Sequence, residues 1–423
     1  MIEGRRGWCL LPLLCAAAAC APRLAPVAPE PLPAEHARPL TDVRFEPSPE
    51  RIERGRYLAN AAIGCVHCHS ERDPRRPGTP PAPGRELAGR IVEDEKGRFL
   101  AAPNLTPDVE TGAGAWSDDM LARAIREGVG HDGRALGGPM WWWAFRALSD
   151  EDLAAIVVYL RTVPPVKNRL PPRRLSLESE RSRARSARPL EGPVAARDLA
   201  DPLVRGRYLI EIADCMGCHS AWEAPVNAGF GAGGNELEPG VFSLNLTPDP
   251  SGLGPYTREM FVGLLRSGRG GTLHGVMPWA SYRQMTEDDL GAIYEALRQL
   301  PPVAHRVHNS APRTPCPVCG QEHGLGELNS APVLERVEAD LGPLEAYAGD
   351  YRFGIDDIGI DVRDGRLWVV GFAESDIELV PVAGGRLRGL GFPFPVSFER
   401  DAAGRVTTLI TWEIGPTRWT RDR

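Results

Sequence analysis

Two short stretches, Cys65-Val66-His67-Cys68-His69 and Cys215-Met216-Gly217-Cys218-His219, decide most of what this sequence of 423 residues encodes. Each stretch places two thiols three residues apart and an imidazole directly after the second thiol. Arg-Gly-Arg-Tyr-Leu precedes both, and Asn-Leu-Thr-Pro-Asp and then Pro-Pro-Val follow both in the same order. We therefore interpret the sequence as a tandem duplication in which the second copy has shorter loops. The recurring segments are 54–58 and 205–209, 104–108 and 245–249, and 164–166 and 301–303.

The pattern C-x-x-C-H is typical of covalent haem attachment, because two thiols so spaced reach two vinyl groups on one porphyrin edge and the next histidine ligates the iron. The sequence therefore predicts two covalently bound haem c groups. The first would use Cys65, Cys68 and His69, and the second would use Cys215, Cys218 and His219.

Each copy also shows three helical segments. The first begins at Ser48-Pro49-Glu50, where a cap residue precedes a proline at the first helical position. A middle helix begins near Ser117 or Thr257, and a last helix begins at Ser149 or Thr286 with close relatives of the capping box. We expect the first and last helices to cross at Gly55 and Tyr159 in one copy and at Gly206 and Tyr294 in the other.

A sixth iron ligand should come from the methionines that precede the last helix, Met140 and Met277. Met120 and Met260 fall on the apolar stripe of the middle helix and Met285 aligns with Leu148, so core packing is the simpler interpretation for these three. The second copy has the order Met277-Pro278, whereas the first has Pro139-Met140. His131 in the first copy and His274 in the second remain alternative ligands. His67 should lie on the surface.

Residues 49–304 resemble two fused class I c-type cytochrome domains, most similar to cytochrome c subunits of periplasmic dehydrogenases. The resemblance is carried by the two C-x-x-C-H sites, the NLTPD segments and the stretches LSDEDLAAIVVYLRTVPPV and MTEDDLGAIYEALRQLPPV. It implies all-α haem domains with His/Met-ligated iron, and a redox partner such as a dehydrogenase, a terminal oxidase or another cytochrome.

The N-terminus resembles an export signal, with Arg5 and Arg6 ahead of an apolar run that is too short to span a bilayer. Ala17-Ala18-Ala19-Cys20 resembles a bacterial lipoprotein box, so we expect a periplasmic protein held at the membrane by a lipid on Cys20. A cleaved, free protein is the alternative. The net charge of −7 gives no indication of nucleic-acid binding.

Two further segments follow the cytochrome-like copies. Cys316 and Cys319 lack a following histidine, and in an oxidising compartment we favour a local disulfide over a zinc site with His305, His308 or His323. From about 341, alternating apolar residues and turn pairs such as Asp364-Gly365 predict a small antiparallel sheet or barrel. That segment resembles the β-domain appended to some serine hydrolases and peptidases.

The sequence thus predicts a multidomain protein with two all-α cytochrome c domains and a small β-domain. Its expected function is electron transfer, and the alternatives are a dihaem peroxidase or sulfur-compound oxidase and a haem-based redox sensor. A basic linker between the haem domains could contact haem propionates, phospholipid or an acidic partner, or be only a solvated connection. The expected divisions are 1–20 (signal peptide), 21–48 (Pro/Ala-rich tether), 49–166 (first cytochrome domain), 167–200 (basic linker), 201–304 (second cytochrome domain), 305–340 (linker with C-x-x-C) and 341–423 (β-domain).

Overall fold

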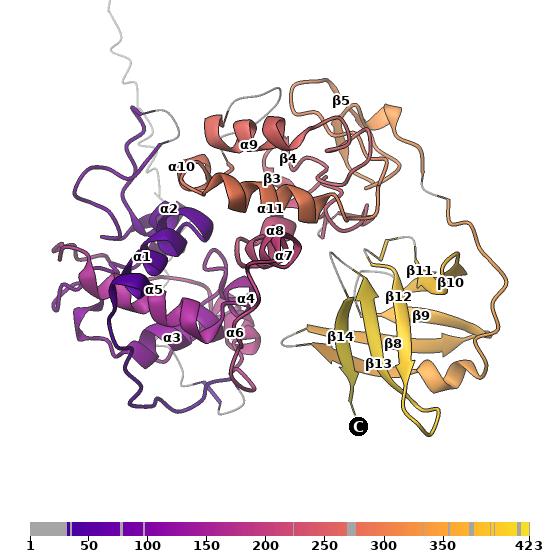
Figure 1. Cartoon of the computed structure of the whole chain (residues 1–423), viewed down its shortest axis with the longest axis horizontal. Helices are drawn as coiled ribbons and strands as arrows, with labels where there is room; N and C mark the ends of the chain where they lie inside the picture. Colours follow the sequence, from indigo (N-terminus) through magenta and orange to yellow (C-terminus); the bar gives the residue numbers. More distant parts are fainter. Residues whose placement is uncertain are drawn as a thin grey trace, which may run out of the picture.

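The structure is a computed structural model, and it combines two helical units with a C-terminal β-barrel (Figure 1). We use "first unit" for residues 49–166 and "second unit" for residues 201–304. The expected signal peptide, including Cys20, lies outside the described residues. These are 32–33, 36–76, 79–95, 98–222, 224–268, 276–331, 333–353, 356–371, 376–389, 391–392, 394–412 and 416–422.

The first unit begins as the sequence predicts. Ser48 caps α1 (Pro49–Tyr57) by accepting a hydrogen bond from the Arg51 backbone N–H at 3.2 Å. The chain continues through a π-helical turn, η1 (Leu58–Ala62), into α2 (Cys65–His69), which carries the first C-x-x-C-H stretch. Ser117 and Ser149 cap the remaining long helices in the same manner. These are α3 (Asp118–Glu127) and α5 (Asp150–Thr162), with the short α4 (Trp142–Phe145) between them.

The second unit has the corresponding order of helices. Asp201 and Thr257 cap α7 and α9, and Thr286 caps α11. Both units also contain a short β-hairpin beside the helices, which the expectation of all-α domains did not include. The helices are α7 (Pro202–Ile212), α8 (Cys215–His219), α9 (Arg258–Ser267), α10 (Trp279–Tyr282) and α11 (Glu287–Leu297); the hairpins are β1 (Arg90–Glu95) with β2 (Arg98–Ala102) and β3 (Glu236–Glu238) with β4 (Val241–Phe242).

The first and last helices of each unit touch through a glycine. A Cβ atom placed on Gly55 would lie 1.9 Å from the carbonyl oxygen of Ala155 and 2.8 Å from the Cβ of Tyr159. A Cβ on Gly206 would lie 2.0 Å from the carbonyl oxygen of Ala292, with Ala296 as the next neighbour. The predicted crossing at Gly55 and Tyr159 is confirmed, whereas Gly206 meets Ala292 and Ala296 rather than Tyr294.

The segment between the units is more ordered than a solvated linker. It contains α6 (Leu177–Ser186), which Ser176 caps. Arg174 pairs with Phe99 through two backbone hydrogen bonds of 2.8 and 2.9 Å, so this segment extends the hairpin of the first unit. Arg183 then donates to the Gly138 carbonyl oxygen at 3.0 Å. The basic segment therefore lies against the loop that carries Met140.

The C-terminal segment forms a closed barrel of eight antiparallel strands, β7 to β14, and β14 pairs with β7 to close it. Asp364 and Gly365 both have positive φ, as a tight turn between β8 and β9 requires. Apolar side chains such as Tyr351 and Leu409 fill the interior. The strands are β7 (Gly349–Phe353), β8 (Asp356–Arg363), β9 (Arg366–Val370), β10 (Ile377–Val382), β11 (Arg386–Arg388), β12 (Val396–Arg400), β13 (Val406–Trp412) and β14 (Pro416–Arg421).

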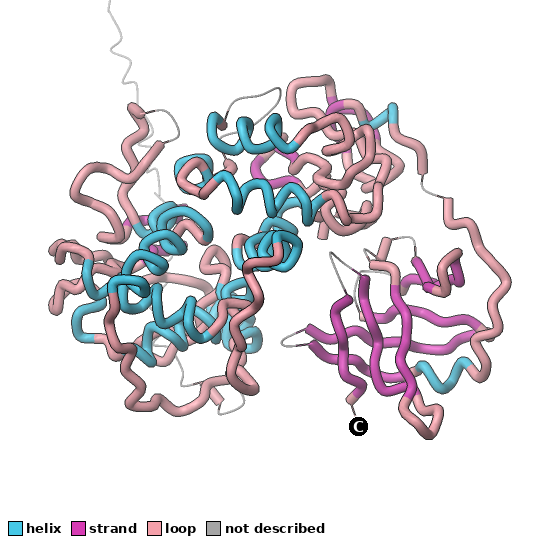
Figure 2. The backbone as a smooth tube through the Cα atoms, viewed as in Figure 1, coloured by secondary structure: helices cyan, strands magenta, loops and turns pink. Residues whose placement is uncertain are grey.

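In space, the second unit lies next to the first unit, and the barrel lies next to the second unit (Figure 2). Helices of both units contribute to one continuous hydrophobic core, whereas the barrel has a core of its own. An extended segment after the second unit leads to the barrel, and Phe394 of the barrel packs on Phe230 of the second unit with 5.3 Å between ring centroids. Among the described residues, none of the helices has both the length and the apolarity that crossing a bilayer requires.

Candidate haem sites and their shared interface

The two C-x-x-C-H stretches form one-turn helices with the same backbone geometry. Both begin after a residue in the left-handed region, Gly64 with φ +63° and Asp214 with φ +51°. The cysteines are free thiols in both helices. Burial raises the pKa of Cys65 and of Cys215 to about 12, so these thiols stay protonated at neutral pH. Such thiols are poorly suited to disulfide exchange, which proceeds through the thiolate.

The histidine that ends each stretch is buried and held by one backbone hydrogen bond. His69 donates from Nδ1 to the carbonyl oxygen of Pro103 at 2.8 Å, and His219 donates from Nδ1 to that of Leu244 at 2.7 Å. Because a carbonyl only accepts, the proton is on Nδ1 and the Nε2 lone pair is available to a metal. Burial also lowers the pKa of His69 to about 4 and lowers that of His219, which keeps both rings neutral.

The recurring Asn-Leu-Thr segments explain how these carbonyl groups are positioned. Asn104 follows Pro103 directly, and its amide donates to the carbonyl oxygen of Val166 at 2.7 Å. Thr106 Oγ1 accepts a hydrogen bond from the Val166 backbone N–H at 3.1 Å. The second unit has the same contacts, from Asn245 and Thr247 to Val303. Each Asn-Leu-Thr segment thus ties the histidine's backbone partner to the Pro-Pro-Val end of the last helix.

A cavity of about 400 Å³ opens beside the first stretch, within the roughly 300–1,000 Å³ typical of small-molecule and cofactor sites. Cys65, Cys68, His69 and Met140 all line it, so the structure brings together the four predicted residues of the first site. Arginines from the basic segment also line this cavity, as a group with acidic substituents requires. These are Arg169, Arg173 and Arg183.

The structure places only one of the two histidines that were alternatives to methionine as the sixth iron ligand. His131 lines the same cavity and stacks on Trp116, with 4.1 Å between ring centroids, so it remains an alternative to Met140. Met277 is half-buried against the core near α10, and His274 lies outside the described residues. His67 is not a surface residue as predicted, because it lines the cavity and burial lowers its pKa to about 4.

The other methionines support the choice of Met140 and Met277 only in part. Met285 is buried, as expected of a core residue. Met260 is 53% exposed, so its predicted role in the core is wrong: the start of α9 faces solvent.

Two tyrosines that the sequence reasoning did not single out join the units reciprocally. Tyr57 of the first unit donates to Asp289 of the second at 2.5 Å, and Tyr208 of the second donates to Asp152 of the first at 2.6 Å. Both tyrosines belong to the repeated Arg-Gly-Arg-Tyr-Leu segments, and both aspartates lie in the first turn of a last helix. Their recurrence in both copies could have marked the two tyrosines as important. A sequence repeat does not show, however, that each tyrosine binds an aspartate of the other copy.

Residues of the second unit also line the first cavity. Pro278 and Tyr282 from the region of α10 lie on its wall. Tyr282 packs against the hydrophobic core, and this desolvation raises its pKa well above the ordinary value, with smaller contributions from the neighbouring Cys215 and Cys218. One side chain therefore contacts the first cavity and interacts with the second pair of cysteines.

Comparison with known proteins finds subunits of dehydrogenases and a diheme cytochrome c-type protein. The chain is 33% identical over 181 residues to one of the subunits of nicotinate dehydrogenase from Pseudomonas putida, covering 40% of this chain and 14% of that protein. It is 29% identical over 293 residues to the fructose dehydrogenase cytochrome subunit of Gluconobacter japonicus, covering 64% of this chain and 55% of that protein. It is 28% identical over 164 residues to a diheme cytochrome c-type protein of Cereibacter sphaeroides, covering 38% of this chain and 54% of that protein.

These matches support the resemblance to cytochrome c subunits of dehydrogenases. The chain spans little more than half the length of the cytochrome subunits it matches, and much less of the nicotinate dehydrogenase protein. No protein-family model matches the chain. The resemblance of the barrel to a domain of serine hydrolases and peptidases is not supported by these relatives.

Proposed function

We propose that this protein is a dihaem c-type cytochrome that carries electrons in the periplasm between a dehydrogenase and a respiratory acceptor. The observation that carries the proposal is the pair of buried histidines, His69 and His219, each fixed through Nδ1 with Nε2 left for iron. Haem c on each stretch would supply one-electron chemistry by cycling between ferric and ferrous iron. Residues 49–166 and 201–304 are then the two haem-carrying domains.

The protein residues hold each haem through three kinds of contact. Cys65 and Cys68, and likewise Cys215 and Cys218, would provide the thioether bonds. Met140 and Met277 would provide the sixth ligands, and such a His/Met pair would give relatively high potentials. In the first unit, Arg173 is held at the cavity by an ion pair with Glu180 at 2.5 Å, and Arg169 and Arg183 line the same cavity, so this basic wall would face the propionates.

The reciprocal interface supports electron exchange between the two sites. Tyr57–Asp289 and Tyr208–Asp152 fix the orientation of the units, and Tyr282 lies between the first cavity and the second pair of cysteines. Electrons would enter at one site and leave at the other. Because several relatives are cytochrome subunits of dehydrogenases, the donor we propose is a dehydrogenase, and the acceptor is a terminal oxidase or another cytochrome.

Location and docking belong to the same proposal. A lipid on Cys20 would hold the chain at the membrane, and the first part of the stretch 21–48 would act as a tether, because Arg38, Thr41 and Phe45 bind the first unit through Asp119 and Asp118. The barrel packs beside the second site through Phe394, which contacts Phe230 and Trp222. Trp222 in turn donates to the carbonyl oxygen of Met216, between the second pair of cysteines. We therefore propose that the barrel docks a partner next to the second haem.

The alternative function is a dihaem enzyme. The two functions differ in whether the protein occupies both axial positions of each iron. With His and Met on each iron, no substrate binds without displacing a ligand. We expect the reduced protein to be oxidised rapidly by an electron acceptor and to show no turnover of peroxide or thiosulfate. Met277→Ala, which opens one iron position, should gain reactivity toward peroxide, whereas Met260→Ala, at an exposed position, should behave as wild type. Robust peroxide or thiosulfate turnover by the wild-type protein would contradict the proposal.

A further inference from the structure

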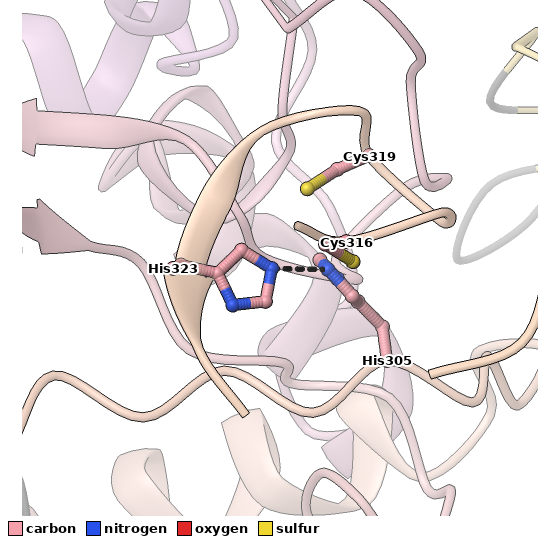
Figure 3. Close-up of side chains that lie close together, drawn as sticks. All are labelled: His305, Cys316, Cys319 and His323. Atoms are coloured by element: carbon pink, nitrogen blue, oxygen red, sulfur yellow. Dashed lines mark hydrogen bonds between the residues drawn. The ribbon is translucent and has the colours of Figure 1, made fainter. Parts of the chain in front are cut away.

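Four buried side chains outside both haem sites converge on one point (Figure 3). Their ligand atoms all lie within 4.8 Å of one another. The free cysteines show that the predicted disulfide between Cys316 and Cys319 does not form in this structure. The four residues are His305, Cys316, Cys319 and His323, with exposed fractions of 0%, 3%, 0% and 0%.

The two cysteines sit in a tight turn between paired strands. β5 (Arg313–Pro315) and β6 (Glu322–Gly324) pair antiparallel, and residues 316–321 connect them. The Cys316 backbone N–H donates to the Gln321 carbonyl oxygen, and the Gly320 N–H donates to that of Cys316, both at 2.9 Å. Gly320 has φ +73°, which a glycine adopts without strain. This turn directs both thiols to the same side, where His323 of β6 also points.

The protonation of the two histidines leaves both lone pairs pointing inward. His305 Nδ1 lies 2.8 Å from the Ala232 carbonyl oxygen, and His323 Nδ1 lies 3.0 Å from that of Gly324. Because carbonyl groups only accept, each Nδ1 carries the proton of a neutral ring. The two Nε2 atoms are 3.2 Å apart. Without a metal, one ring must carry a second proton and donate it to the other ring, whereas a cation between the rings would be bound by both lone pairs.

We propose that His305, Cys316, Cys319 and His323 bind one structural zinc ion. Two thiolates and two neutral imidazoles in a closed, buried set are the ligands of structural zinc, and they compensate its charge. With Zn–N bonds of about 2.0–2.1 Å, tetrahedral geometry places the two nitrogens about 3.3 Å apart, which agrees with the observed 3.2 Å.

The surroundings supply the supporting contacts that metal ligands usually have. The Asn329 amide donates to Cys316 Sγ at 3.3 Å. Gly234, with φ +93°, leaves room for the site, because a Cβ there would lie 2.7 Å from His305 Cε1 and 3.5 Å from Cys319 Sγ. The Val226 backbone N–H donates to the Cys319 carbonyl oxygen at 3.2 Å. The zinc would thus join residues 305–329 to loops of the second unit.

The site also adjoins the loop that supports His219. The Gly233 backbone N–H donates to the His219 carbonyl oxygen at 2.8 Å, and the neighbouring Ala232 carbonyl is the partner of His305. Loss of the metal should therefore loosen the surroundings of the second C-x-x-C-H stretch before those of the first. Faster backbone amide exchange at 231–234 than at the corresponding loop of the first unit would report this.

The test is the zinc content of the full chain after dialysis against a chelator, measured with X-ray absorption at the zinc edge. We expect one zinc per chain with two sulfur and two nitrogen ligands, at about 2.3 and 2.0 Å. Cys319→Ser should lose the ion, and His308→Gln should keep it, because His308 lies nearby but outside the cluster. The absorption spectrum of the wild-type protein decides the question even if Cys319→Ser fails to fold.

Three results would overturn the proposal. They are a chain without zinc, a zinc ion held by other ligands, and a Cys316–Cys319 disulfide that resists alkylation until a reductant is added. A different metal bound by the same four residues would overturn the assignment to zinc. The zinc count does not depend on haem attachment, so this proposal and the proposed function can fail independently.

Discussion

Gly206 packs directly on the backbone of α11, and its replacement by alanine tests the helix crossing on which the second unit depends. The added Cβ would lie 2.0 Å from the Ala292 carbonyl oxygen and 2.9 Å from the Cβ of Ala296. Neither atom is the end of a flexible side chain, so α7 and α11 must separate. Overpacking of this kind costs about 1–3 kcal/mol, and we place this site at the upper end because backbone must move.

The substitution has an opposing contribution, because alanine favours a helix over glycine by about 1 kcal/mol. The net loss for Gly206→Ala should therefore be about 2 kcal/mol, or about 4–8 °C in melting temperature for a cooperative unit of about 150–250 residues. Gly263→Ala is the matched control: it lies within α9, and its Cβ would have no neighbour within 4 Å. This control should gain up to about 1 kcal/mol.

Both variants are compared with wild type by denaturant unfolding, followed by far-ultraviolet circular dichroism. Equal stability of Gly206→Ala and Gly263→Ala would refute the close crossing of α7 and α11.

Three further outcomes follow from the interface, the iron ligands and the barrel. Burial and the bond to Asp289 raise the pKa of Tyr57 to about 12, so its stabilising contribution is complete below pH 10 and is lost as the pH rises through 12. Tyr57→Phe should cost about 1.5–3 kcal/mol at pH 8 and less at pH 12 in denaturant unfolding, and a cost that does not change with pH would contradict this. Met277→Ala should abolish part of the methionine–iron band at the red edge of the visible spectrum and lower one potential, and an unchanged band would move the ligand elsewhere. Phe394→Ala should release the barrel from the second unit, seen as faster proteolysis between residues 329 and 348; unchanged cleavage would argue against docking through Phe394.

Local signals in the sequence predicted much of the fold. Ser48, Ser117 and Ser149 begin helices as expected, because a capping side chain satisfies backbone donors of its own first turn. The barrel hairpins were likewise predictable from turn residues and alternation. Closure of the barrel was left open, because the pairing of β14 with β7 joins the two ends of the domain.

Contacts between distant segments were not predictable from one sequence. Tyr57 and Asp289 are 232 positions apart, and no local pattern indicates that each tyrosine reaches the other unit. The four residues of the proposed zinc site were recognised as candidates, but a single C-x-x-C favoured a disulfide. His305 lies near the cysteines because the segment that follows Pro-Pro-Val packs on the second unit. There the Asn245 side-chain amide donates to the His305 carbonyl oxygen at 3.2 Å.

The most direct test of the account is the number of covalently attached haems per chain. Mass spectrometry of the exported protein should find two. Cys65→Ser with Cys68→Ser should leave one haem, on the second stretch, and Cys215→Ser with Cys218→Ser should leave one on the first. Replacement of Cys316 and Cys319 should leave both haems attached. A wild-type chain without covalent haem, or one whose haem count does not change with these cysteines, would contradict the central claim.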